Sequence, residues 1–178
     1  EPSQPTTVQQ TAARALKGHI LTPEVRPSAI RTFTGQAPTT AQLEVLKAME
    51  GEVDRPEATG VLEAAAHPDN PTTVQQMAMQ LARSSNHPEV RQVARAGLLQ
   101  GNPTTVQLKA VEALAEGQQD PAASAAIEEL LRGQAATTVQ IAAVQALARH
   151  LDTPRGPHAL AAALERSQPT TTQLRAVA

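Results

Sequence analysis

The sequence predicts an all-α protein built from repeated helix–turn–helix units, and three observations support this prediction. The pentapeptide PTTVQ stands at residues 5–9, 71–75 and 103–107, and near copies begin at residues 38, 136 and 169, so the period is 32 or 33 residues. In the five full copies a second proline follows the start of the repeat by 17 or 18 residues. Between these landmarks the apolar residues recur at helical spacing, and no segment has the alternation of a strand.

The first helix of each repeat is predicted to begin at the pentapeptide. Thr followed three residues later by Gln is the capping-box pattern, in which the two side chains satisfy two backbone N–H groups at a helix start. The alternative, that these threonines are phosphorylation sites, lacks a neighbouring arginine cluster that would bind a phosphate. The pairs are Thr6 and Gln9, Thr39 and Gln42, Thr72 and Gln75, Thr104 and Gln107, Thr137 and Gln140, and Thr170 and Gln173.

The second helix of each repeat is predicted to begin at the second proline, because proline fits the first helical turn. Glycines mark where helices should stop. Pro27, Gly60 and the Gly156–Pro157 pair fall in the first turns of the second helices of copies one, two and five. We therefore expect irregular helices there, with those of copies one and five starting late or kinked. The expected stops are Gly18, Gly51 and Gly117 for first helices and Gly35, Gly101 and Gly133 for second helices.

The composition limits the core and the partners. Apolar residues make up 40% of the chain, but there is one Phe and no Trp or Tyr, so a thin core of alanine with scattered Leu, Val and Ile is expected. A net charge of −2 gives no field to hold nucleic acid or an anionic membrane. No apolar run approaches the roughly 18 residues of a membrane span. The absence of cysteine excludes disulfides and thiolate metal sites in this chain and leaves its compartment open.

The residues that could carry chemistry are scattered over the repeats. The five histidines are His19, His67, His87, His150 and His158. They form no H-x-x-x-H pair, and the two neighbouring carboxylates, Glu128 and Glu129, point in different directions on a helix. No nucleophile elbow, phosphate-binding loop or dinucleotide fingerprint is present. We expect no catalytic residue, no cofactor and no metal site.

The repeats resemble a known family at residues 87–117, HPEVRQVARAGLLQGNPTTVQLKAVEALAEG. The period alone also suits ankyrin and nearly suits tetratricopeptide repeats, but the ankyrin T-P-L-H turn and the tetratricopeptide aromatic residues are absent. Helices that open with Pro, then Val with Arg or Gln, then an Ala and Leu stripe are similar to short HEAT-like repeats. The resemblance covers residues 5–178.

What the resemblance implies is a right-handed α-solenoid of helix–turn–helix repeats, with five full repeats and one extra helix in a single domain over residues 1–178. It also implies a non-catalytic interaction scaffold. HEAT-like repeats also form DNA glycosylases that grip a duplex in a basic groove, but this chain lacks the aromatic residues and the basic surplus for that role. A structural spacer between domains is the alternative function.

The resemblance also suggests where a partner would bind. In HEAT-like solenoids the second helices line the concave surface. The resemblance therefore suggests that a partner contacts the exposed positions three and seven residues after the opening proline of each second helix. These candidates are Arg26, Glu63, Arg91, Arg95 and Glu128. Their mixed charge suits a polar protein or peptide partner, and ordinary solubilising charge is the alternative interpretation.

The two ends of the repeat array give a further expectation. Repeat arrays normally need polar capping repeats, yet residue 5 opens into an ordinary copy, and Leu174 and Val177 have no second helix to cover them. We expect either a longer protein, of a bacterial type rich in Ala and Pro, or weak end-to-end self-association. No nucleic acid or membrane partner is expected.

Overall fold

The helices of the protein follow the predicted repeat. The computed structural model describes residues 5–35, 37–99, 101–116, 121–133, 135–149 and residue 161. Over these residues it contains helices and no strand, which confirms the all-α prediction. The helices are α1 (Thr6–Ala15), α2 (Arg26–Thr34), α3 (Thr39–Met49), α4 (Ala58–Ala66), α5 (Thr72–Ser84), α6 (Pro88–Gln92), α7 (Ala94–Gly97), α8 (Thr104–Glu116), α9 (Pro121–Arg132) and α10 (Thr137–Ala148). The sixth copy and the second helix of copy five fall outside the described ranges.

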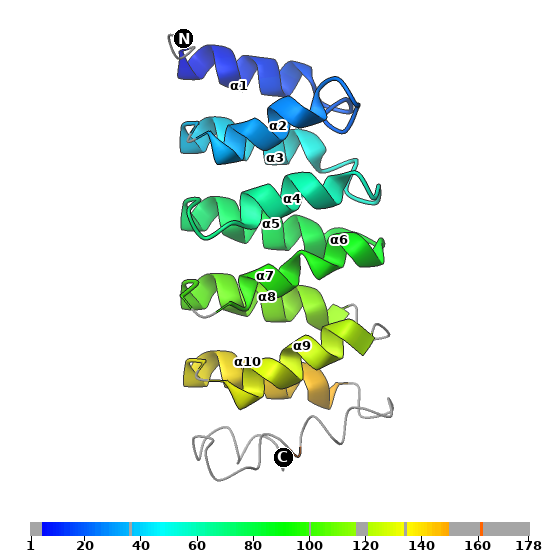
Figure 1. Ribbon diagram of the computed structural model, residues 1–178, viewed down its shortest axis with the longest axis vertical. Coiled ribbons are helices and arrows are strands. Elements are labelled where there is room, and N and C mark those ends of the chain that lie inside the picture. The colour runs from blue at the N-terminus through cyan, green and yellow to red at the C-terminus, as the bar shows by residue number, and fades with distance from the viewer. Residues whose placement is uncertain are drawn as a thin grey trace. The chain divides into compact units, whose positions relative to one another are not determined.

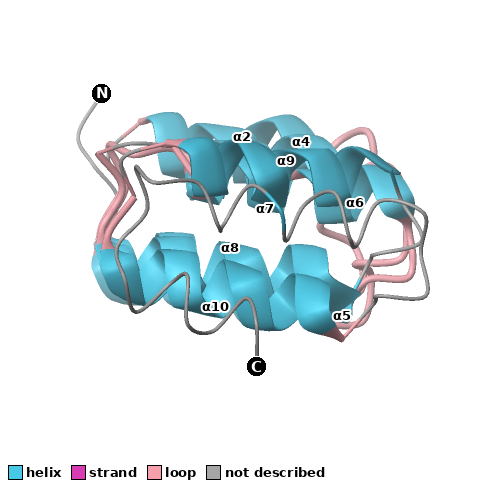
Figure 2. Cartoon of the chain, turned by 90° about the horizontal axis from the view of Figure 1, so that it is seen from below, coloured by secondary structure: helices cyan, strands magenta, loops and turns pink. Residues whose placement is uncertain are grey.

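The chain divides into two compact units, Glu1–Val93 and Ala94–Ala178, which we call the N-terminal and C-terminal units. In the N-terminal unit the first helices α1, α3 and α5 pack against one another in chain order, and α2 packs on α3 and α4 (Figure 1). Seen along the stack, α2 and α4 lie in one layer and α5 in the other (Figure 2).

The C-terminal unit repeats this two-layer arrangement. Helices α7 and α9 both pack on α8, and α10 packs on α8 and α9. Figure 2 shows α7 and α9 in one layer and α8 and α10 in the other. The surface between α7 and α9 carries the candidate site described below.

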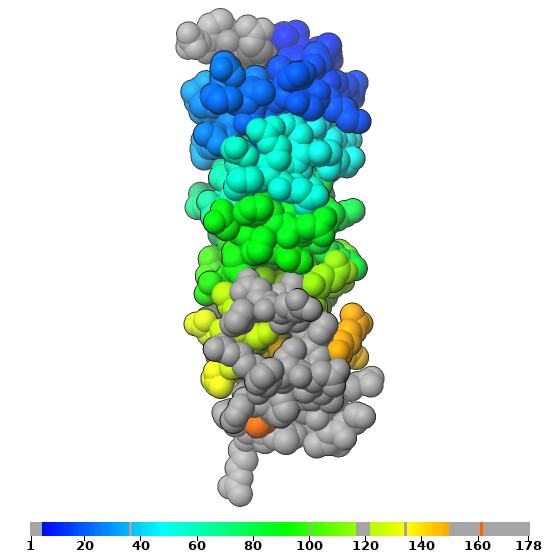
Figure 3. Space-filling model, turned by 90° about the vertical axis from the view of Figure 1, so that its right-hand side faces the viewer, coloured from blue at the N-terminus to red at the C-terminus, as the bar shows by residue number. Residues whose placement is uncertain are grey.

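Small side chains fill much of both cores. Alanine is frequent among the buried residues, and the larger fully buried side chains are Ile20, Leu21, Leu46, Met49, Leu62 and Met79 in the N-terminal unit and Leu114, Ile127, Leu131 and Leu147 in the C-terminal unit. Short side chains let neighbouring helices approach closely. On the face seen in Figure 3, the atoms of successive helices of the N-terminal unit meet in a continuous surface.

The predicted capping boxes are wrong at the starts of α1, α3, α5 and α10. Helices α1, α3, α5 and α10 have no side-chain cap, and their N-cap residues are Pro5, Pro38, Pro71 and Ala136. The threonine is thus the first helical residue, one position too late to cap. At α5 the carbonyl of Pro71 accepts the N–H groups of Val74 and Gln75 at 2.8 and 3.1 Å. The backbone of the pentapeptide, not its threonine side chain, satisfies these groups.

Three copies of the recurrent glutamine, Gln75, Gln107 and Gln140, are buried and bind the turn that precedes their helix. Gln75 Nε2 donates to the carbonyls of Asn70 and Pro68 at 2.7 and 3.1 Å. Gln107 Nε2 donates to the carbonyl of Leu99 at 3.2 Å, and Gln140 Nε2 to that of Gly133 at 3.4 Å. These three glutamines, which the sequence pattern assigned to capping, therefore fix α5, α8 and α10 to the turns that precede them.

Asn70 joins the two helices of copy two, α3 and α4, in the N-terminal unit. Its Nδ2 donates to the carbonyl of Ala64 at 2.7 Å, and its Oδ1 accepts Gln42 Nε2 at 3.1 Å. Asn70 is buried, so these bonds replace water that burial removes. In the C-terminal unit Asn102 holds the matching position, with its Nδ2 donating to the carbonyl of Ala96 at 2.8 Å.

The predicted irregular second helices are confirmed in part. Helix α2 begins at Arg26, three residues after Pro23, as expected for copy one. Helix α4 of copy two begins at Ala58 and contains Gly60 in its first turn. Copy three is interrupted at Val93, where no irregularity was predicted. The region expected to be irregular in copy five lies outside the described residues.

Two of the predicted stop glycines have backbones that favour glycine. Gly18 and Gly101 have φ values of +80° and +100°, which side chains with a Cβ adopt at a cost. Gly35 and Gly133 directly follow the last residues of α2 and α9. The stop signals are therefore close to the observed helix ends, and Gly117 falls outside the described ranges.

Candidate functional site

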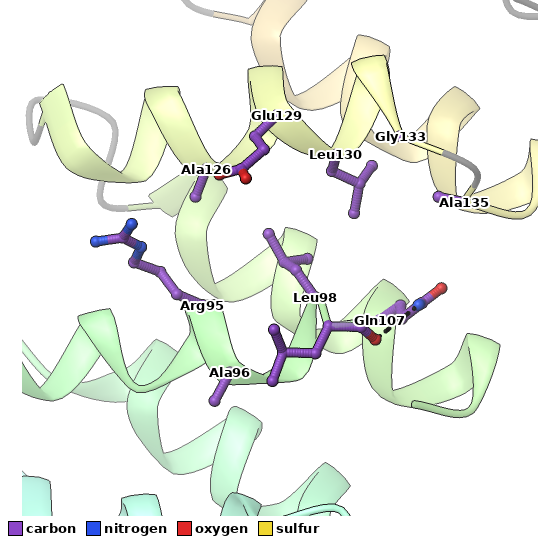
Figure 4. A pocket seen from close by; sticks show the side chains of 10 residues that line it. Arg95, Ala96, Leu98, Gln107, Ala126, Glu129, Leu130, Gly133 and Ala135 are labelled. Atoms are coloured by element: carbon purple, nitrogen blue, oxygen red, sulfur yellow. Dashed lines mark hydrogen bonds between the residues drawn. The ribbon is translucent and has the colours of Figure 1, made fainter. Parts of the chain in front are cut away.

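A groove of about 720 Å³ lies in the C-terminal unit between α7 and α9 (Figure 4). Its size falls within the range of small-molecule and peptide-binding pockets. We call it the α7–α9 groove, and its lining is Arg95, Ala96, Leu98, Leu99, Gln107, Ala126, Glu129, Leu130, Gly133 and Ala135.

The middle of the groove is apolar. Leu98 of the α7 side and Leu130 of α9 point toward one another (Figure 4). Leu99 also lines the groove and is 55% exposed, which is unusual among the large apolar side chains of the described chain. The small residues Ala126 and Gly133 leave the space open instead of filling it. An exposed leucine beside an unfilled apolar cavity is a typical contact point for another molecule.

One end of the groove carries a cation and an anion. Arg95 extends from α7, and Glu129 from α9, at the same end of the cavity (Figure 4). Both side chains belong to exposed residues, and neither forms a hydrogen bond or ion pair with any part of the described chain. Their full charges are available to a ligand that brings complementary groups.

The backbone acceptors around the groove already have partners. The carbonyl of Ala96 accepts the amide of Asn102, and the carbonyl of Leu99 accepts the amide of Gln107, as the dashed line in Figure 4 shows. The carbonyl of Gly133 accepts the amide of Gln140. The groove therefore offers side chains, not backbone groups, to a ligand.

A second cavity of about 500 Å³ lies in the N-terminal unit and differs in character. Phe33 lines it and is buried, and Gln42 and Asn70 in its wall are bonded to each other. His67 and Asp69 stand at its exposed rim, where His67 Nδ1 lies 3.4 Å from a carboxylate oxygen of Asp69. Gln42 Oε1 is buried there without a hydrogen-bond partner, but the lining holds no exposed large apolar side chain, so this cavity is the weaker candidate for a binding site.

The five predicted contact residues fall in different places. Arg95 lines the α7–α9 groove. Glu128 does not; it lies 3.7 Å from Arg132 Nη2, and the groove is lined by its neighbour Glu129. In the N-terminal unit, Glu63 is exposed on α4, while Arg26 and Arg91 are half-buried. Arg91 also donates to the carbonyl of Asn86 at 3.4 Å.

Sequence reasoning missed the apolar lining, although a signal for it exists. Counting from the opening proline of each second helix, Leu99 occupies the position held by Thr34, His67 and Arg132 in other copies. With Glu165 of copy five, four copies place a polar residue there and one places leucine. A large apolar residue at a position that is otherwise polar indicates a contact surface.

The carboxylates with shifted pKa values connect repeats. Glu44 of α3 accepts Arg14 Nε of α1 at 2.8 Å and Lys47 Nζ at 3.1 Å, and the hydrogen bond from Arg14 is the largest cause lowering the pKa of Glu44 to about 2. The backbone N–H of Asn86 likewise lowers the pKa of Asp54. Both groups are acceptors in structural contacts between turns or helices.

Neither a cluster of metal ligands nor a membrane-spanning helix occurs in the part of the chain that the structure describes. No three His, Cys, Asp or Glu residues there gather as metal ligands would. No helix in those residues has the length and apolar character that a membrane crossing requires. His150 and His158 lie outside the described residues.

Comparison with known proteins does not identify a relative of this chain. No family model, curated protein or solved structure matches the sequence or its fold.

Proposed function

We propose that this chain is a non-catalytic protein-interaction scaffold, built as a right-handed α-solenoid of HEAT-like repeats, and that the α7–α9 groove is its main contact surface. The observation that carries the proposal is the exposed Leu99 in an apolar groove whose end holds the unpaired charges of Arg95 and Glu129. An apolar centre with charges at its edge is the pattern of protein-binding surfaces.

The chemistry of the carboxylates supports a binding role over a catalytic one. A general acid or base works best with a pKa near the working pH. The pKa values of Glu44 and Asp54 are instead lowered, because hydrogen bonds from Arg14 and Asn86 favour their charged forms. Such groups hold repeats together and are poor proton donors at neutral pH.

The five predicted contact residues are expected to contribute unequally to partner binding. Arg95 is the anchor, because its guanidinium is exposed, unpaired and able to form two parallel hydrogen bonds with a carboxylate. Glu63 is equally free to meet a partner on the N-terminal unit. Arg26, Arg91 and Glu128 contribute less, since each is half-buried.

The test is capture of partners from lysate by the immobilised full chain, with bound proteins identified by mass spectrometry. The groove variant carries Arg95→Glu and Leu99→Ser, and the control carries Lys17→Glu, which reverses an exposed cation outside the groove. The proposal expects a defined set of proteins on the wild type and the control that is lost from the groove variant at unchanged helicity.

The structural-spacer alternative predicts a different result. A spacer captures no defined set of proteins, or captures the same set with the groove variant as with the wild type. Either outcome contradicts the proposal. Recovery of nucleic acid with steep salt dependence would contradict it as well.

A further inference from the structure

We propose that the α7–α9 groove binds an amphipathic α-helix of a partner protein, with the apolar face of that helix over Leu98, Leu99 and Leu130. An acidic side chain of the helix meets Arg95, and a basic one meets Glu129. This inference rests on the proposed function and specifies the secondary structure and the charge pattern of the ligand.

The backbone around the groove favours a helical ligand over an extended one. An extended peptide needs hydrogen-bond partners for its own N–H and C=O groups, which a strand edge would supply. Here the carbonyls of Ala96, Leu99 and Gly133 accept the amides of Asn102, Gln107 and Gln140. A helix satisfies its backbone internally and needs only side-chain contacts.

The walls of the groove suit the surface of a helix. The walls come from α7 and α9 and from the turns that follow them, and Ala126 and Gly133 on the α9 side are small enough to let another helix approach closely. Leu98 and Leu130 point toward the open space from opposite sides (Figure 4). A ligand helix with apolar residues three and four positions apart would fill the space between them.

The charges of Arg95 and Glu129 determine which charged residues the partner helix must carry. Arg95 and Glu129 lie at the same end of the groove and have no partner in the described chain (Figure 4). A ligand must bring both an acid and a base to this end, because leaving either charge covered and unpaired would cost affinity. This requirement excludes uniformly acidic and uniformly basic helices.

The experiment uses the full chain and a phage-displayed library of helical peptides. Leucine is fixed at i, i+3, i+4 and i+7, and the flanking positions vary among Glu, Lys and Ala. Enriched peptides are synthesised, their affinities are measured by fluorescence anisotropy, and their helicity is followed by circular dichroism. The variants are Arg95→Glu and Leu99→Ser, with Lys17→Glu as the control.

The inference expects enriched peptides with both Glu and Lys beside the leucines, and a gain of helicity on binding. Arg95→Glu should weaken binding by roughly tenfold or more, and changing the peptide's Glu to Lys should restore part of the loss. Leu99→Ser should also weaken binding, while Lys17→Glu leaves it unchanged. Partial rescue by the charge swap identifies Arg95 as a direct contact.

Three outcomes overturn the inference. The first is that no peptide is enriched; the second is that enriched peptides bind both groove variants as tightly as wild type; the third is that they bind without gaining helicity. If lysate proteins are still lost from the groove variant, the proposed function stands and only the helical ligand is wrong. If Leu99→Ser instead abolishes self-association of the chain, the occupant is a second copy and the inference fails.

Discussion

Gln75 sits at the start of α5, where its buried amide donates to two carbonyl groups of the preceding turn. Thr72, three residues earlier, makes no capping bond. Gln75 therefore stabilises the start of α5 through side-chain hydrogen bonds and Thr72 does not, although the capping-box pattern in the sequence pairs the two residues.

We predict that Gln75→Ala lowers the free energy of unfolding by about 1 to 3 kcal/mol, because it leaves the carbonyl of the buried Asn70 without this donor. Thr72→Ala should change it by less than about 0.5 kcal/mol, as surface substitutions usually do. Urea unfolding followed by circular dichroism measures both. A similar loss for the two variants would restore the capping-box interpretation.

The ion pairs of Glu44 make a pH-dependent contribution. Its pKa falls from 4.5 to about 2 because Arg14 and Lys47 donate to the carboxylate, so its stabilising effect is complete above the unfolded value and is lost as the pH falls toward 2. We predict that Glu44→Gln destabilises the protein at neutral pH and that the difference from wild type disappears at the acid end of this window. Thermal unfolding at the two pH values measures it.

Glu63→Gln is the matched control for that experiment. Glu63 is exposed on α4 and forms no ion pair or hydrogen bond with a described residue. Its substitution should leave thermal unfolding unchanged at both pH values. A difference for Glu44→Gln that persists at the acid end would show that packing, not charge, explains its effect.

At the scale of the elements, Gly60 lowers the stability of α4, although neither its backbone conformation nor the space around it requires glycine. A Cβ there would lie 3.9 Å from Ile30 Cδ1, which is ordinary contact, and its φ is not positive. We predict that Gly60→Ala stabilises the protein by about 0.4 to 1 kcal/mol, by reducing the freedom of the unfolded chain. Differential scanning calorimetry measures the change.

Gly101 provides the opposite case. Its φ of +100° strains any residue with a Cβ, even though space around it is open. Gly101→Ala should cost about 1 to 3 kcal/mol. If both alanine variants destabilise equally, the close packing of α2 on α4 controls Gly60, and our explanation of that helix is wrong.

The elements show how far sequence reasoning reaches. The period, the helix starts and most stops follow from Pro, Gly and apolar spacing, which act locally. The partners of Gln75 and Asn70 did not follow, because their hydrogen bonds depend on how a turn packs against the next helix. The sequence predicted Glu128 as a contact residue, but its neighbour Glu129 lines the groove. Successive side chains on a helix point about 100° apart, so an error of one residue changes the surface that a side chain faces.

The groove was not predicted for a related reason. The predicted contact positions follow from offsets of three and seven residues after the opening proline, whereas the cavity depends on the exposed Leu99 and on small residues that leave space. Whether Leu99 packs inside or faces solvent depends on tertiary contacts. Comparison among copies does identify it, since Thr34, His67 and Arg132 hold its position elsewhere.

At the scale of the whole molecule, α1 has an uncovered face. Val8 is 49% exposed, whereas the matching Val74, Val106 and Val139 are 0% exposed. Burial of an exposed valine stabilises association by the hydrophobic effect. We predict weak concentration-dependent self-association in analytical ultracentrifugation, and less of it for Val8→Lys. A species that stays monomeric at every concentration would contradict this.

The central claim, that the α7–α9 groove contacts a protein partner, is tested most directly by site-specific photo-crosslinking in lysate. A photoreactive amino acid replaces Leu99, whose exposure tolerates a bulky side chain, and replaces Lys17 in the control. We predict that a defined protein crosslinks from position 99, is lost when Arg95→Glu is added, and does not crosslink from position 17. No crosslinked protein at position 99, or the same products from both positions, would contradict the claim.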